Sequence, residues 1–90
     1  MQADKTKVIR LLKTVKGQID GLIKMVEEDR YCIDISTQVL ASQSLLKRIN
    51  LEILKAHFTH CVKNSLESGS ELDKEAKISE MVGVLDKILK

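Results

Sequence analysis

The sequence predicts an all-α protein with three helices in each chain. Three observations lead to this prediction. The 90 residues contain no proline and only 2% aromatic residues, a composition that disfavours β-sandwiches and barrels. Apolar residues recur every three or four positions along most of the chain. A strong break, Ser68-Gly69-Ser70, interrupts the second half of the chain. We expect one helical domain that spans residues 1–90.

The first helix is expected over about residues 4–28, because its apolar residues follow one another in steps of four and three. These residues are Val8, Leu12, Val15, Ile19, Leu22 and Val26. A charged cluster at residues 27–30 interrupts the pattern, and Asp29 is expected to cap the helix that follows.

The second helix is expected over about residues 31–66, since the stretch from Cys32 to Leu66 has neither proline nor glycine. Apolar residues lie on two sides of it. The first helix can cover only one side, so we expect a partner subunit on the other. A third helix is expected over about residues 72–89. A chain this short buries a limited core by itself, which also favours an oligomer.

Basic residues gather on the first helix although the net charge is only +2. At 100° per residue, five of the six basic residues at positions 5–24 fall within an arc of roughly 140°, opposite the apolar residues, and Lys7 is the exception. The five are Lys5, Arg10, Lys13, Lys16 and Lys24. One interpretation is a solvated surface. The other is a face that contacts DNA phosphates, extended by Lys47, Arg48 and Lys55 of the second helix. No helix-turn-helix, zinc-finger or RRM motif accompanies these residues.

Two cysteines and a histidine form the clearest candidate site. His57 and Cys61 are four positions apart and share one side of a helix, about 6 Å apart along its axis. Cys32 precedes His57 by 25 positions, which is roughly 37 Å along an unbroken helix. An antiparallel dimer that crosses near Leu45 and Leu46 brings Cys32 of one subunit beside His57 and Cys61 of the other.

Two thiolates and one imidazole suit Cu(I) or zinc, and the lack of a fourth strong ligand favours Cu(I). His60 is the residue that would complete a tetrahedral site for zinc, nickel or cobalt. It lies about 100° from Cys61 around the helix, so we expect it to point away. The alternative is that the cysteines are small buried apolar residues and His57 is a surface imidazole.

The chain is expected to act in the cytoplasm without a membrane partner. It shows no secretory segment and no apolar run of membrane-spanning length. We do not expect an enzyme, because the sequence has no Ser-His-Asp set, catalytic carboxylate pair or phosphate-binding loop.

Three blocks of sequence resemble the CsoR/RcnR family of small all-helical transcriptional repressors. They are KTVKGQIDGL at residues 13–22, MVEEDRYC at residues 25–32, and the segment from His57 to Cys61. The spacing of Cys32, His57 and Cys61 is similar to that of the copper-sensing CsoR branch. The resemblance implies an antiparallel dimer that forms a four-helix bundle, with two dimers paired into a tetramer. It also implies that the metal-free protein binds operator DNA and that Cu(I) releases it.

The resemblance further implies roles for individual residues. Tyr31 and Glu80 match positions that connect the metal-bound His57 to the third helix. Arg48 matches a DNA-binding arginine, whereas Leu11 stands where relatives often carry arginine. The candidate DNA-binding residues are therefore Arg10, Lys13, Lys16 and Arg48. The alternative function is a thiol-sensing repressor, in which Cys32 and Cys61 of neighbouring protomers react with persulfide.

Overall fold

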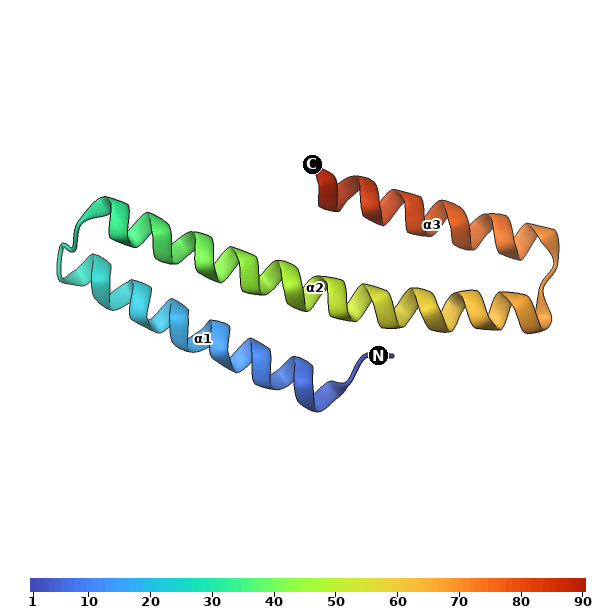
Figure 1. Ribbon diagram of the computed structural model, residues 1–90, viewed down its shortest axis with the longest axis horizontal. Coiled ribbons are helices and arrows are strands. Elements are labelled where there is room, and N and C mark those ends of the chain that lie inside the picture. Colours follow the sequence, from blue (N-terminus) through green and yellow to red (C-terminus); the bar gives the residue numbers. More distant parts are fainter.

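The computed structural model describes the backbone of all 90 residues and every side chain except those of residues 66 and 68. It contains three helices: α1 (Lys5–Glu27), α2 (Cys32–Ser68) and α3 (Glu71–Leu89) (Figure 1). The described backbone has no strand, so the prediction of an all-α chain with three helices is confirmed. The observed helix ends lie within two residues of the expected ones.

A short turn joins α1 to α2 and closes α1 with a Schellman motif. The amide of Asp29 donates to the carbonyl of Val26, and the amide of Arg30 donates to that of Met25. Asp29 has φ 53°, a left-handed conformation that aspartate tolerates better than most residues. The expectation that Asp29 caps the second helix is wrong. It terminates α1 instead, and the N-cap of α2 is Tyr31, which makes no side-chain capping bond.

The break between α2 and α3 lies at the predicted position. A Cβ atom on Gly69 would overlap the carbonyl oxygen of Ser65, so glycine lets the chain pass close to the last turn of α2. The hydroxyl of Ser70 accepts a hydrogen bond from the amide of Asp73 at 3.1 Å and caps α3.

The α1–α2 contact contains the buried core of the chain. Val8, Val15 and Ile49 are each no more than 5% exposed. A polar pair crosses the same interface, where Ser42 Oγ donates to Gln18 Oε1 at 2.8 Å. Ser42 is only 6% exposed. A shift of one helix along the other would therefore leave its buried hydroxyl without the hydrogen bond to Gln18. This pair therefore helps to set the register of the two helices.

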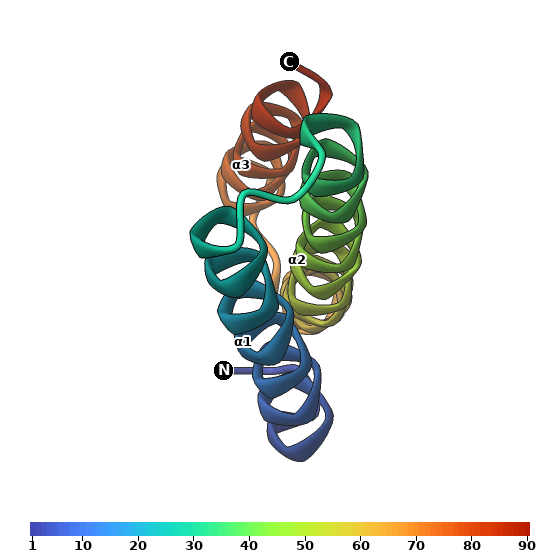
Figure 2. The same ribbon diagram turned by 90° about the vertical axis from the view of Figure 1, so that its left-hand side faces the viewer.

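The third helix packs along the C-terminal half of α2 (Figures 1 and 2). Among the described residues, α3 makes no contact with α1. Along this half, Leu54 and Phe58 of α2 are half-buried. The sequence predicts a partner subunit on this second apolar side. Along its C-terminal half, α3 of the same chain covers part of that side, while Leu51 and Val62 remain 47% and 41% exposed. In the other half, Ile33 and Leu40 remain 58% and 59% exposed.

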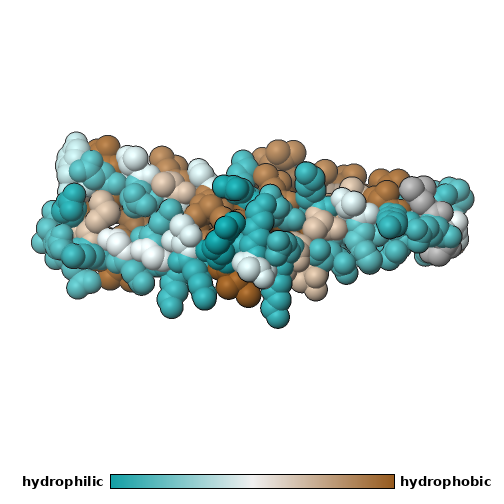
Figure 3. Space-filling view, turned by 60° about the horizontal axis from the view of Figure 1, so that its bottom comes forward, coloured by the Kyte–Doolittle hydropathy of each residue, from teal (hydrophilic) through white to brown (hydrophobic). Residues whose placement is uncertain are grey.

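The three helices form little more than a single layer. The Cα atoms extend over 58 × 29 × 12 Å. The accessible surface is 6988 Å², whereas a compact monomer of 10.1 kDa has about 5,300 Å². Seen from the side on which α1 lies, hydrophobic patches reach the surface between hydrophilic side chains (Figure 3). The isolated chain thus leaves apolar side chains uncovered that a folded monomer normally buries.

Candidate functional site

The unbroken course of α2 places the candidate ligands at two distant points of the chain. Cys32 is the first residue of α2 and is exposed, whereas His57 and the half-buried Cys61 lie in its C-terminal half. The 25-residue separation along a continuous helix is about 37 Å. Within one chain, Cys32 therefore cannot approach the other two residues. Tyr31 lies at the same end as Cys32, is 68% exposed and is equally far from His57.

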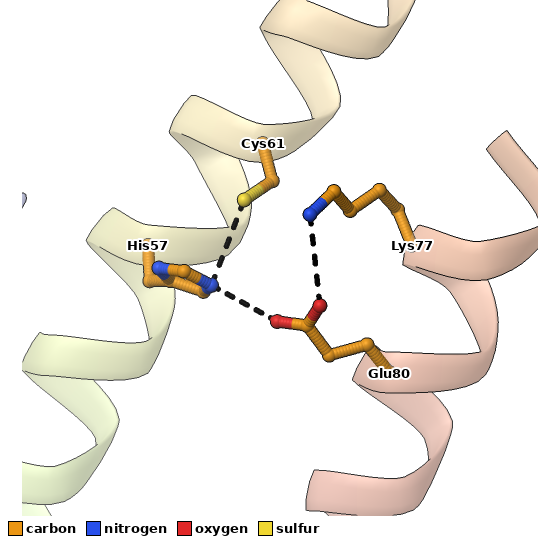
Figure 4. A network of polar contacts seen from close by, with 4 residues as sticks. All are labelled: His57, Cys61, Lys77 and Glu80. Atoms are coloured by element: carbon orange, nitrogen blue, oxygen red, sulfur yellow. Dashed lines mark hydrogen bonds and ion pairs between the residues drawn. The ribbon is translucent and has the colours of Figure 1, made fainter. Parts of the chain in front are cut away.

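Around His57 the structure assembles a small polar network (Figure 4). His57 Nε2 lies 3.0 Å from Glu80 Oε1 of α3 and 3.5 Å from Cys61 Sγ one turn along α2. Lys77 Nζ lies 3.7 Å from the second carboxylate oxygen of Glu80. Glu80 thus sits between an imidazole on α2 and an ammonium on its own helix. The sequence-predicted contact of Glu80 with the region of His57 is present without any contribution from Tyr31.

The network affects the charge state of Glu80. The hydrogen bond from His57 lowers the pKa of this carboxyl, and the nearby charge of Lys77 acts in the same direction. An ionised carboxylate can only accept hydrogen bonds, so the N–H of a neutral His57 ring belongs on Nε2. The nitrogen that keeps a lone pair for a metal ion is then Nδ1.

The donor chemistry at this position fits a soft metal ion incompletely. His57 and Cys61 offer one nitrogen and one sulfur on the same side of α2. In the described part of a single chain, no three His, Cys, Asp or Glu side chains are arranged to hold a metal ion. His57 and Cys61 thus lie together, whereas Cys32, the third ligand that the sequence predicts, begins the same helix far from them.

His60 does not join this network. Its Nε2 lies 3.1 Å from the amide nitrogen of Asn64. Its side chain lines an open cleft with Lys55 and Lys63, in which neither His57 nor Cys61 takes part. This location agrees with the expectation that His60 points away from Cys61.

The candidate DNA-binding residues are all exposed. Arg10 and Lys13 line one shallow depression on α1 together with Thr6, Ile9 and Thr14. Lys16 lies farther along α1, and Arg48 projects from α2. Sequence reasoning missed Lys77 as a neighbour of Glu80, although their spacing of three residues on a helix was a usable signal.

An apolar depression lies between the C-terminal half of α1 and the beginning of α2. It has a volume of about 320 Å³. Its lining residues are Ile19, Leu22, Ile23, Val26, Glu27, Ile35 and Val39. Ile23 and Val26 are 53% and 58% exposed, so this side of the hairpin is open to a further apolar surface. In the described part of the chain, no helix has a stretch both long and apolar enough to cross a bilayer.

Comparison with known proteins identifies the family. A family model described as metal-sensitive transcriptional repressor matches residues 4–87. The chain belongs to this family. The expectation that it is not an enzyme is thereby confirmed, since members of this repressor family are transcriptional regulators.

Individual members of the metal-sensitive repressor family are similar over most of the chain. The copper-sensing transcriptional repressor CsoR of Bacillus subtilis (strain 168) is 40% identical over 87 residues, which cover 97% of this chain and 83% of that protein. The copper-sensing transcriptional repressor RicR of Mycobacterium tuberculosis is 34% identical over 79 residues, which cover 88% of this chain and 81% of that protein.

Two solved structures of such repressors have the same fold. The copper-sensing repressor CsoR with Cu(I) from Geobacillus thermodenitrificans NG80-2 superimposes with a TM-score of 0.81 at 32% identity, over 100% of this chain and 94% of that one. The nickel-responsive transcriptional regulator InrS superimposes with a TM-score of 0.83 at 28% identity, over 98% and 96% of the two chains. The resemblance to the CsoR/RcnR family that the sequence motifs indicated is confirmed.

Proposed function

We propose that this chain is a copper(I)-responsive transcriptional repressor of the cytoplasm. The metal-free form binds operator DNA, and Cu(I) bound between two subunits releases it. Cys32 of one subunit and His57 and Cys61 of the other are the proposed ligands. The observation that carries the proposal is that His57 and Cys61 lie one turn apart on the same side of α2, with Cys61 Sγ 3.5 Å from Nε2 of the imidazole ring, while the same helix holds Cys32 far away in the same chain.

The choice of metal rests on donor chemistry and on relatives. Thiolate sulfur is the ligand that Cu(I) prefers. Two sulfurs and one nitrogen provide three mostly soft ligands, a low coordination number that suits this ion. Several similar repressors carry copper-sensing names, whereas InrS is nickel-responsive. X-ray absorption of the anaerobic Cu(I) form tests the choice. We expect two sulfurs and one nitrogen, and a four-coordinate nitrogen-rich shell with a preference for nickel would contradict it.

The proposed partner of each chain is a second copy in antiparallel orientation, which forms a four-helix bundle, with two dimers paired into a tetramer. The apolar depression at Ile23 and Val26 and the excess of accessible surface support a partner. About 1,700 Å² beyond the surface of a compact monomer is available per chain. A standard interface removes about 800 Å² from each partner, so one or two such interfaces fit this excess.

The link between metal and DNA is proposed to run through His57, Glu80 and α3. The Nε2–H of His57 donates to Glu80, so the orientation of the ring and the position of α3 depend on each other. Metal coordination would fix that ring. Linkage then requires operator DNA to weaken Cu(I) binding by the same factor as Cu(I) weakens DNA binding. Equal Cu(I) affinities with and without operator would contradict the proposal.

A subunit-mixing experiment tests whether the site lies between chains. Cys32→Ser and Cys61→Ser homodimers each lack one sulfur at both sites. A mixed dimer of the two variants contains one complete site, because the intact Cys32 faces the intact Cys61. We expect tight Cu(I) binding to return on mixing, at up to one ion per mixed dimer. No recovery would exclude the inter-subunit site.

The thiol-sensing alternative uses the same two cysteines. A substitution at His57 distinguishes it from copper sensing. A His57→Ala variant should lose its response to Cu(I) if the metal is the inducer. It should keep a response to persulfide if the cysteines react with each other. A variant that keeps its full copper response would contradict the copper proposal.

A further inference from the structure

An open basic cleft lies beyond the N-terminal end of α1. Because α2 continues past the beginning of α1 (Figure 1), the side of α2 that α1 covers elsewhere is uncovered at this point. The cleft has a volume of about 480 Å³. The residues that line it are Gln2, Glu52, Lys55, Ala56, Thr59, His60 and Lys63. The proposed metal site uses none of them.

The charge of this cleft is positive. Lys55 and Lys63 are both exposed. Glu52 is the acid among the lining residues, and its carboxylate is already paired with Lys7 Nζ at 3.2 Å. Because the charges of Lys7 and Glu52 cancel, Lys55 and Lys63 leave a net charge of +2. An uncompensated positive concavity attracts an anionic partner.

The cleft continues the candidate DNA-binding surface of α2. At 100° per residue, Arg48, Lys55 and Lys63 fall within about 80° of one another around the helix. From Arg48 to Lys63 this stripe is roughly 22 Å long. Duplex DNA carries one phosphate charge per about 1.7 Å of its axis, so a stripe of this length passes several phosphates. Glu52 interrupts the stripe but is neutralised by Lys7.

We infer that the cleft is a phosphate-contacting part of the DNA interface, with Lys55 and Lys63 as its contact residues. The inference rests on the proposed repressor function and adds the cleft and Lys63 to the surface for which Lys55 was already a candidate. These lysines make sequence-independent contacts, so they contribute affinity and salt dependence rather than selection of the operator. The DNA surface then extends along α2 past the end of α1.

The salt dependence of DNA binding tests this inference. The probe is a duplex enriched from a random-sequence library by the wild-type protein, and affinity is measured by fluorescence anisotropy from 0.05 to 0.2 M salt. Each lost phosphate contact reduces the slope of log affinity against log salt by about 0.9. For each protein chain that contacts the duplex, a Lys55→Gln/Lys63→Gln double variant should therefore lose about tenfold less affinity over this range than the wild type does.

Matched variants distinguish the possible outcomes. Lys55→Arg/Lys63→Arg should restore the wild-type slope, and Lys87→Gln on α3 should leave it unchanged. Circular dichroism checks that all variants remain helical. If the wild type binds DNA and the double glutamine variant has the same slope, the inference is wrong although the repressor function stands. If the wild type shows no salt-dependent DNA binding, the result would instead contradict the proposed repressor function. If polyglutamate, and not DNA, binds in a way that depends on the two lysines, the cleft docks an acidic protein and the inference is also wrong.

Discussion

An Ile23→Ala variant is expected to weaken the proposed dimer while leaving the chain folded. Ile23 lies on α1, lines the apolar depression and is 53% exposed in the single chain. Alanine has a higher helix propensity than isoleucine, so α1 itself should not be weakened. The effect of the substitution should therefore appear in association and not in helicity.

The size of the effect follows from the exposed part of the side chain. Full burial of an aliphatic side chain of this size contributes about 1.5–3 kcal/mol, so covering the exposed half of Ile23 contributes about 1 kcal/mol. A two-fold interface contains the residue twice, which gives about 2 kcal/mol per dimer. This corresponds to a dissociation constant about 30-fold higher.

Sedimentation velocity over a dilution series measures this constant directly. Leu89→Ala is the control, because Leu89 is 82% exposed at the end of α3 and lines no part of the depression. We also expect Ile23→Ala to bind less Cu(I) at low protein concentration, since the proposed site needs two chains. A wild-type protein that sediments as a monomer at micromolar concentration would refute the reasoning, as would identical constants for Ile23→Ala and wild type.

Three further predictions concern the single chain. Ser42→Ala leaves the amide oxygen of Gln18 without its partner, and we expect a loss of about 1 kcal/mol in urea unfolding. The pKa of Glu80 is expected below the ordinary carboxyl range and should rise in His57→Ala, which a carboxyl-carbon NMR titration measures. Because this pKa is lowered by folding, the contact should stabilise α3 at neutral pH and be lost as the pH falls through the lowered value. Asp29→Val should cost about 1 kcal/mol and Asp29→Gly nothing, since valine disfavours the positive φ that glycine accepts; thermal unfolding distinguishes them.

Most of the local structure was predictable because its causes are local. The apolar spacing in α1, the absence of glycine and proline through most of α2 and the break at Gly69 each act over a few residues. The turn between α1 and α2 was harder to predict from the sequence. Asp29 looked like a cap for the second helix, but the same residue type also tolerates the left-handed conformation that closes α1.

The candidate site was only partly predictable, because only part of it depends on spacing within one helix. The neighbours His57 and Cys61 followed from a four-residue helical step. The exclusion of Cys32 from their site within one chain followed from the length of a straight helix. Sequence spacing alone could not show which side of α2 the third helix would cover.

Helix positions and the distance between the two cysteines were thus determined by the sequence itself, because hydrogen bonding and rise per residue within a helix do not depend on distant parts of the chain. Only the tertiary structure decided that α3 folds back along the C-terminal half of α2, that Glu80 meets His57 across 23 residues, and that the basic cleft at Lys55 and Lys63 stays open. These features depend on how whole helices pack, and packing is settled by the combined fit of many side chains rather than by the spacing of a few.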